Sequence, residues 1–183
     1  MNPSPNLFLI GPMGAGKSSI GRRLAAHFDM PCIDLDAAIE ERTGTRVATI
    51  FEIEGEAGFR RRESALLAEL ADRDGVVLAT GGGAVLAADN RAVLHARGFV
   101  LWLKASVEQQ MRRLVRDRQR PLLEVPDRQA QLEHLARVRD PLYQELADLA
   151  VASEGETCQQ SALRITALLA AHWQRAIPAG HPA

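Results

Sequence analysis

Short apolar runs recur along the chain and alternate with longer segments in which apolar residues return every three or four positions. A run that is apolar on both faces is typical of a strand buried in a parallel sheet. The longer spacing instead indicates one buried face of a helix, as for Ile20, Leu24 and Phe28. The short runs predict strands at residues 6–10, 31–34, 76–79, 99–103 and, more weakly, 149–152.

Helices are predicted between these strands. They cover residues 19–28, 35–42, 59–70, 91–96, 107–116 and 161–173. Strands that alternate with helices pair in parallel, and the helices then cover both faces of the sheet. The pattern therefore predicts a three-layer α/β fold formed by one domain over residues 1–183.

Two segments fit these layers poorly. Residues 35–62 include an acidic turn at 52–56, and residues 116–127 continue a basic stretch into a Pro-Leu-Leu sequence. We expect the first segment to be a substrate-binding insert and the second to be a mobile lid. No internal repeat or low-complexity linker divides the chain.

Composition narrows the class of function. The net charge is -1 and aromatic residues make up 4% of the chain, which argues against a general nucleic-acid binder. Cys32 and Cys158 belong to no disulfide or metal-binding pattern, which favours a reducing compartment. No apolar run approaches the roughly 20 residues that span a bilayer, and the first residues lack a signal-peptide pattern. We expect a cytoplasmic protein with neither nucleic-acid nor membrane partners.

The segment GPMGAGKS at 11–18 matches G-x-x-x-x-G-K-[ST] at every fixed position, after a predicted strand and before a predicted helix. Its glycines let the backbone amides turn inward, and the helix N-terminus favours phosphate. Lys17 can reach the outer phosphates and Ser18 can bind Mg²⁺, which a plain Gly-rich turn would not explain. No guanine-reading NKxD accompanies the motif. The residues expected to bind ATP here are Gly14, Ala15, Gly16, Lys17, Ser18 and Ser19.

Two carboxylates follow the second predicted strand. Asp34 and Asp36 are two positions apart, so on an extended segment both would point the same way, toward the phosphate loop. One could hold Mg²⁺ through water and the other could receive a hydroxyl proton. The alternative is an Asp that caps the following helix, and the residues alone leave this choice open.

Arginines and glycines mark the remaining candidate positions. For Arg61 and Arg62 we favour an exposed helix face, the usual place of charged residues. The triplet at 81–83 fits a loop where a ligand, such as a carboxylate, approaches backbone amides, because one turn does not need three glycines. No Asp of the ordinary Walker B type ends the strand before it, so Asp34 is the leading candidate to support magnesium. Arg139 would by itself be an unremarkable residue on a surface helix.

A basic stretch, which includes Arg112, Arg113, Arg116 and Arg118, ends at Arg120 and Pro121. A nucleic-acid-binding role is weakened by the slightly negative net charge. A lid arginine that reaches the transferring phosphoryl group is the sharper interpretation.

The ordered series GPMGAGKSS, DLD, GFRRRE, TGGGAV, RPLL and VRDPLY resembles the shikimate kinases along nearly the whole chain. The phosphate loop alone is widely shared, whereas the combination is far more specific. The resemblance implies transfer of the ATP γ-phosphoryl group to the 3-hydroxyl of shikimate, in the biosynthesis of chorismate and aromatic amino acids. It also implies the P-loop fold of nucleoside monophosphate kinases, with a parallel five-stranded sheet, and a monomer.

The resemblance also assigns roles on the nucleotide side. Lys17 and Ser18 match the positions that hold phosphate and Mg²⁺, and Asp34 matches the carboxylate that supports the metal, through water. Asp36 matches the carboxylate that binds the acceptor hydroxyls and orients or deprotonates the attacking one. Arg120 matches a catalytic lid arginine over the phosphates of ATP.

On the acceptor side, the resemblance places Arg60 and Arg139 at the substrate carboxylate, assisted by the region of Gly82. The planar fork of arginine suits a carboxylate because it can bind both oxygens.

Two other functions remain as alternatives. A related small-molecule kinase such as a gluconate kinase would use the same phosphate loop, but a neutral polyol end does not call for both arginines. A nucleotide-binding regulatory or RNA-binding protein would use the basic lid, and it predicts slow ATP turnover without stimulation by an acceptor.

Overall fold

A parallel sheet of five strands, in the order β2–β3–β1–β4–β5, forms the centre of the molecule. The computed structural model describes residues 4–115, 121–152 and 156–175. The sheet and its parallel pairing were predicted from the sequence, and each strand was placed to within one residue at either end. The strands are β1 (Asn6–Ile10), β2 (Cys32–Asp34), β3 (Val77–Ala79), β4 (Gly98–Lys104) and β5 (Leu149–Ala152).

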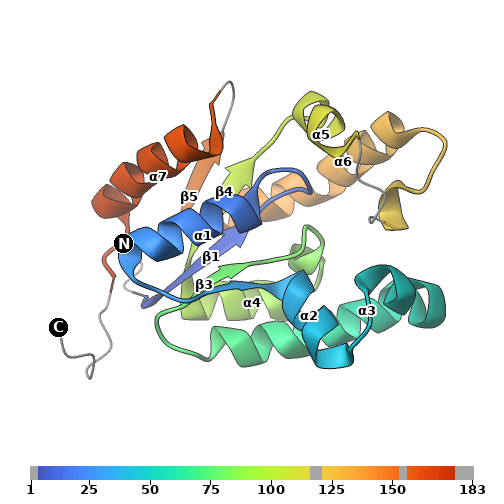
Figure 1. Ribbon diagram of the computed structural model, residues 1–183, viewed down its shortest axis with the longest axis horizontal. Helices are drawn as coiled ribbons and strands as arrows, with labels where there is room; N and C mark the ends of the chain where they lie inside the picture. Colours follow the sequence, from blue (N-terminus) through green and yellow to red (C-terminus); the bar gives the residue numbers. More distant parts are fainter. Residues whose placement is uncertain (1–3, 116–120, 153–155, 176–183) are drawn as a thin grey trace.

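Helices and short 3₁₀ turns connect these strands (Figure 1). In the described ranges, the α-helices are α1 (Lys17–Phe28), α2 (Leu35–Thr43), α3 (Val47–Ala71), α4 (Ala88–Arg97), α5 (Val107–Leu114), α6 (Arg128–Leu146) and α7 (Cys158–His172). The 3₁₀ turns are η1 (Ala84–Leu86) and η2 (Pro121–Leu123).

The core lies on both faces of the sheet. Leu7 and Leu9 of β1 pack into one cluster, with α1 and α7, and Phe8 and Ile10 pack into the other, with α2, α3, α4 and α6. This alternation follows from the opposite directions of successive strand side chains. Figure 1 shows α1 and α7 side by side on one face and α3 and α4 on the opposite face. The predicted three-layer α/β fold is confirmed.

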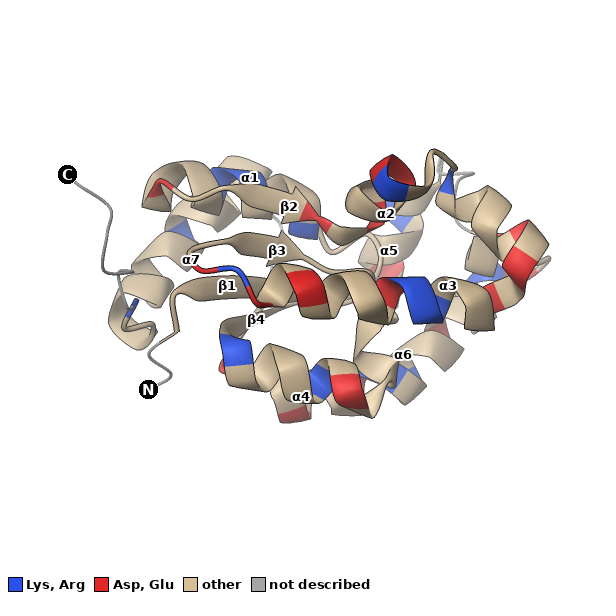
Figure 2. Ribbon diagram, turned by 90° about the horizontal axis from the view of Figure 1, so that it is seen from below, with Lys and Arg blue, Asp and Glu red and all other residues tan. Residues whose placement is uncertain are grey.

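Charged residues lie outside the central strands. Figure 2 shows them on the helices and connecting loops, whereas β1 and β3 carry none. Within the described residues, no helix is both long and apolar enough to cross a membrane. The charged groups that meet the sheet do so where its strands end.

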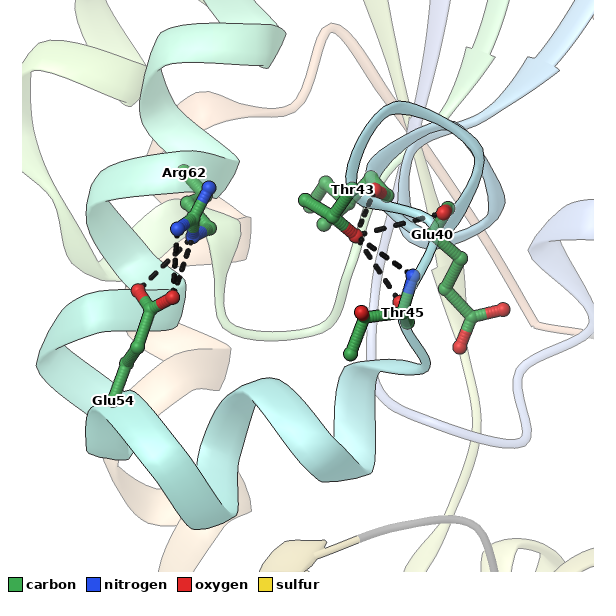
Figure 3. Close-up of polar contacts among 6 residues, drawn as sticks. Glu40, Thr43, Thr45, Glu54 and Arg62 are labelled. Atoms are coloured by element: carbon green, nitrogen blue, oxygen red, sulfur yellow. Dashed lines mark hydrogen bonds and ion pairs between the residues drawn. The ribbon is translucent and has the colours of Figure 1, made fainter.

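Helix α3 corrects the prediction for residues 47–58. We expected a helix over 59–70 after an acidic turn at 52–56, but the helix begins at Val47 and is kinked at Gly55. Gly55 has φ 69° and ψ 179°, a backbone conformation that glycine adopts without a steric penalty. Arg62 donates to both carboxylate oxygens of Glu54 across the kink, with Nη2···Oε1 at 2.6 Å (Figure 3).

The turn between α2 and α3 is held by its own side chains. Thr43 Oγ1 donates to the Ile39 carbonyl at 2.8 Å, and Glu40 Oε1 accepts from the Val47 amide at 2.8 Å (Figure 3 shows Thr43, Thr45 and Glu40). The Glu40 contact satisfies one of the amides that a helix N-terminus leaves without an intrahelical partner. The start of α3 is therefore fixed to the end of α2.

Helix α6 was not predicted. It begins after Asp127, whose carboxylate accepts from the Ala130 amide at 2.9 Å, and it contains Pro141. Its buried positions are Leu132, Arg139, Tyr143 and Leu146. Arginine at a buried position breaks the apolar stripe by which a helix is recognised in a sequence, and proline argues against a helix.

Candidate active site

The phosphate loop joins β1 to α1 as the sequence predicted. Gly11, with φ 136°, lies so close to β4 that a Cβ there would approach the Leu103 carbonyl oxygen to 2.3 Å. Gly16, with φ 91°, caps α1 without a side-chain hydrogen bond, so the first amides of the helix are left to a ligand. Lys17 Nζ donates to the Gly11 and Pro12 carbonyls, each at 2.8 Å. The lysine therefore folds back over the loop that would hold phosphate.

A cavity of about 250 Å³ opens beside this loop, and we call it the P-loop cavity. Ala15 does not line it, because its methyl group packs into the core. Arg120, the predicted lid arginine, lies outside the described residues. The lining includes the loop residues Gly14, Gly16, Lys17, Ser18 and Ser19 together with Asp34, Asp36, Thr80, Gly81 and Gly82.

The sequence interpretation did not single out one arginine that contacts the phosphate loop. Arg113 Nη1 donates to the Gly14 carbonyl at 2.9 Å, from α5 across to the loop. Its only sequence signal was membership of the basic stretch, in which several arginines look equivalent.

Asp34 caps the following helix and also contacts the phosphate loop. It is the last residue of β2 and caps α2, because Oδ1 accepts from the Ala37 amide at 3.2 Å. Its other oxygen, Oδ2, accepts from the Ser18 hydroxyl. The cap therefore fixes a carboxylate directly beside the serine of the phosphate loop.

Asp36 corrects the geometric argument made from the sequence. It lies in the first turn of α2, not on an extended segment, so the two carboxylates are not related by the two-residue repeat of a strand. Asp36 nevertheless reaches the phosphate loop region, since it lines the P-loop cavity and also a second cavity next to it.

The second cavity has a volume of about 200 Å³, and we call it the Arg60 cavity. Met13, Asp36, Gly81 and Gly82 line both cavities, so the two spaces meet at these residues. The other lining residues are Glu40, Val47, Phe51, Phe59, Arg60, Glu63, Gly83, Pro121, Leu122 and Arg139.

Arg60 is the arginine of α3 that faces this cavity. Nη1 donates to Glu63 Oε2 at 2.6 Å, and Nε and Nη2 donate to Glu56 Oε1 at 3.2 and 2.9 Å. Arg61 and Arg62 are exposed, as predicted. The structure thus separates the three consecutive arginines, which the sequence could not do.

The sequence interpretation did not single out Glu63, which is completely buried in the structure. Burial raises the pKa of Glu63, and the Arg60 guanidinium opposes that rise. A signal was present, because Glu63 falls on the apolar face of α3 with Phe59, Leu66 and Leu67. A glutamate on the apolar face of a helix requires a partner inside the protein.

Arg139 is the second cation of the cavity, and it is only 4% exposed. The prediction of a surface position from its local sequence is wrong, because α6 turns this residue toward the sheet. No carboxylate of the described residues forms an ion pair with it, and Nε has no hydrogen-bond partner there. Burial holds the pKa of Arg139 below its ordinary value. A buried cation in this state is unfavourable unless a ligand supplies the counter-charge.

The three glycines at 81–83 are explained largely by neighbouring side chains. A Cβ at Gly81 would lie 2.5 Å from Glu63 Oε1, and one at Gly83 would lie 2.1 Å from Arg60 Nη2. These two positions make room for the charged pair of α3. Gly82 differs, because a Cβ there would lie 3.4–3.5 Å from the phosphate loop and from Arg139 Nη1, which are ordinary contact distances. The expectation that the triplet also lets a ligand approach backbone amides stays a prediction.

The arrangement places an anion site beside a phosphate loop, with a carboxylate between them. Phosphoryl transfer requires mainly alignment and charge neutralisation, which these groups can supply. The fold and the paired cavities define a P-loop kinase of small molecules.

Comparisons with known proteins identify the family. The family model described as shikimate kinase matches residues 13–170. A shikimate kinase of Stenotrophomonas maltophilia is 51% identical over 175 residues, covering 96% of this chain and 97% of the relative. A solved shikimate kinase from Acinetobacter baumannii, in complex with shikimate, is 44% identical with a TM-score of 0.89, covering 92% and 94% of the two chains. The chain belongs to the shikimate kinase family, and it is an ATP-dependent kinase that acts on a hydroxyl of shikimate.

A gluconokinase from Sinorhizobium meliloti shares the fold more distantly. It is 19% identical with a TM-score of 0.60, covering 92% of this chain and 93% of its own. At this identity the likeness concerns the fold alone.

Proposed function

We propose that this enzyme transfers the γ-phosphoryl group of ATP to the 3-hydroxyl of shikimate, giving shikimate 3-phosphate and ADP. The observation that carries the proposal is Arg139, a buried guanidinium without an ion-pair partner among the described residues, beside Arg60 in a cavity that adjoins the phosphate loop. Shikimate is a small anion with vicinal hydroxyls, so it would complete the charge balance of this cavity.

On the nucleotide side, we assign Lys17 to the outer phosphates, where its charge would stabilise the transferring group. Ser18 and Asp34 would hold Mg²⁺, the serine directly and the aspartate through water. Their contact brings two oxygen donors together, and oxygen is the ligand that Mg²⁺ prefers. Phosphate and water would supply the other ligands, because Mg²⁺ usually keeps several waters and binds one or two protein groups.

Between the cavities, Asp36 would orient the attacking hydroxyl and accept its proton. This role is supported by its position, since Asp36 lines the spaces on both sides of the expected transfer. Bound shikimate would have its carboxylate at the far end, toward Arg60, Arg139 and Gly82. Two guanidinium groups at one carboxylate would fix the direction of the ring and hence which hydroxyl meets Asp36.

The segment 35–62 is proposed as the substrate-binding insert, because α2 and the first part of α3 line the Arg60 cavity. The lid assignment for 116–127 stays a prediction. Residues 116–120 lie outside the described part of the chain, and Pro121 and Leu122 line the same cavity. A monomer in the cytoplasm is likewise our proposal, on the basis of the family resemblance.

The test is ADP release from Mg-ATP with shikimate, with gluconate and without an acceptor. We expect strong stimulation by shikimate alone. Gluconate also carries a carboxylate, but its flexible open chain does not hold a hydroxyl at a fixed distance from that carboxylate, as the ring of shikimate does. Equal stimulation by gluconate would contradict specificity for shikimate and would favour the alternative, a gluconate kinase. ATP turnover that no acceptor changes would exclude a kinase acting on either compound.

A further inference from the structure

Tyr143 lies one helical turn after Arg139 and has no role in the chemistry described so far. It is 1% exposed, and its ring packs against Trp102 with a centroid distance of 5.7 Å. Its hydroxyl donates to the carbonyl of Gly82 at 2.5 Å. The polar end of a core side chain therefore ends on the loop that lines both cavities.

Arg139 approaches the same glycine. A Cβ placed on Gly82 would lie 3.5 Å from Arg139 Nη1, and the Tyr143 hydroxyl donates to the Gly82 carbonyl. Residues four apart lie on one face of a helix, so α6 presents the guanidinium and the hydroxyl to the loop together. Burial raises the pKa of Tyr143, and the charge of the Arg139 guanidinium opposes that rise.

The bond to Gly82 also fixes a peptide plane. The backbone contains no cis peptide within the described residues, so the N–H of Gly83 points opposite to the carbonyl of Gly82. A carbonyl held toward Tyr143 thus turns that amide away from the core, and both glycines line the Arg60 cavity. Rotation of this peptide would misplace a donor and the floor of the cavity at once.

We propose that Tyr143 is a positioning residue for the substrate carboxylate, acting through Arg139 and the peptide between Gly82 and Gly83. The inference rests on the proposed binding of shikimate in the Arg60 cavity. The ring of Tyr143 serves packing, which phenylalanine would serve equally well. The hydroxyl serves the site, because it joins α6 to the loop at the point where the two arginines meet it.

The experiment is Tyr143→Phe, which removes only the hydroxyl. We expect the KM for shikimate to rise about tenfold, as for loss of a buried hydrogen bond that leaves a carbonyl unsatisfied. The dissociation constant of ATP, measured without shikimate, should stay within about twofold, because the contacts of Lys17 and Ser18 are untouched. The melting temperature should fall by only a few degrees, as for the loss of one buried hydrogen bond in a chain of this size.

Leu146→Ala is the matched control. Leu146 is the next buried residue of α6 and belongs to the same core cluster, but it lines neither cavity. Its truncation should lower the melting temperature by several degrees through lost packing and leave the KM for shikimate unchanged.

An unchanged KM for shikimate in Tyr143→Phe would overturn the inference. So would a variant that loses its fold, since the hydroxyl would then be structural. Failure of the proposed function would appear separately, as unmodified enzyme whose ADP release does not respond to shikimate.

Discussion

The two cavities are built in different ways. Half of the residues that line the P-loop cavity, including Gly14, Gly16, Lys17 and Ser18, belong to one loop and the helix that follows it. The Arg60 cavity is assembled from α2, α3, the loop after β3 and α6, which are far apart in the sequence. A local motif brings its own geometry, whereas an assembled site depends on every element that places a side chain in it.

The difference extends to charge. In the P-loop cavity, Lys17 is held by two backbone carbonyls and Ser18 donates to Asp34, so both of these side chains have partners in the chain. In the Arg60 cavity, Arg60 is paired with Glu63, but Arg139 is buried without an ion-pair partner among the described residues. In the phosphate loop, the charged side chain is already held by the chain and the first amides of α1 are left to a ligand. In the Arg60 cavity, a buried charged side chain is itself left without an ion-pair partner among the described residues.

The largest effect is expected for Lys17→Ala. It should reduce kcat on the order of 100- to 1,000-fold, because a fixed charge at the transferring phosphoryl group is lost. Lys104→Ala is the matched control, since Lys104 is the only other lysine of the chain and lines neither described cavity. Near-normal turnover by a folded Lys17→Ala variant would show that the phosphate loop does not take part in phosphoryl transfer.

The two aspartates should separate in a magnesium titration. Asp36→Asn is expected to lower kcat on the order of 100-fold at every magnesium concentration, because hydroxyl orientation and proton acceptance are lost. Asp34→Asn should instead raise the magnesium concentration that gives half-maximal rate. Parallel behaviour of the two variants would refute this division of roles.

The arginines of the assembled cavity should affect shikimate and spare ATP. Arg60→Ala and Arg139→Ala are each expected to weaken shikimate binding by roughly 1.5–3 kcal/mol, about 10- to 150-fold. Arg61→Ala, the exposed neighbour, should have little effect. Calorimetric titration of each variant with shikimate and with ATP provides the measurement. A large loss of shikimate binding in Arg61→Ala alone would show that Arg61, and not Arg60, binds the substrate.

Thermal unfolding of the same variants tests whether Arg60 and Arg139 differ in their ion pairing when no ligand is bound. Arg60→Ala leaves the buried Glu63 carboxylate without its ion-pair partner and should destabilise the fold by roughly 3 kcal/mol. Arg139→Ala removes an uncompensated buried cation, so the melting temperature should not fall comparably. Equal destabilisation would mean that Arg139 has a partner in the free protein.

A smaller effect is expected for Gly83→Ala. The new methyl group would overlap the Arg60 guanidinium and displace it, raising the KM for shikimate about tenfold through loss of part of a charged hydrogen bond. Gly21→Ala in α1 is the control, because its Cβ meets only ordinary contacts of 3.5 Å or more. Unchanged steady-state kinetics for Gly83→Ala would show that the Arg60 guanidinium can move away from residue 83 without weakening shikimate binding.

The sequence predicted the sheet, the layers and the P-loop because these depend on local patterns. Asp36 was identified as a site residue, although the extended geometry assumed for it was wrong. Arg139 could be assigned only through the family resemblance, because its burial results from the packing of α6 and not from its neighbours in the sequence. Tyr143 was missed for the same reason, since it looks like an ordinary helix residue until α6 is placed beside the glycine loop. Glu63 was overlooked although its position on the apolar face of α3 was a signal in the sequence.

The central claim is that the Arg60 cavity recognises a carboxylate. The most direct test compares kcat/KM for shikimate and its methyl ester, which keeps the ring hydroxyls and loses the charge. Unmodified enzyme should prefer shikimate by about 10- to 100-fold, in line with a charge-assisted hydrogen-bond pair. Arg139→Ala should reduce most of that preference. Equal use of both compounds by the unmodified enzyme, or a preference that survives in Arg139→Ala, would contradict the account.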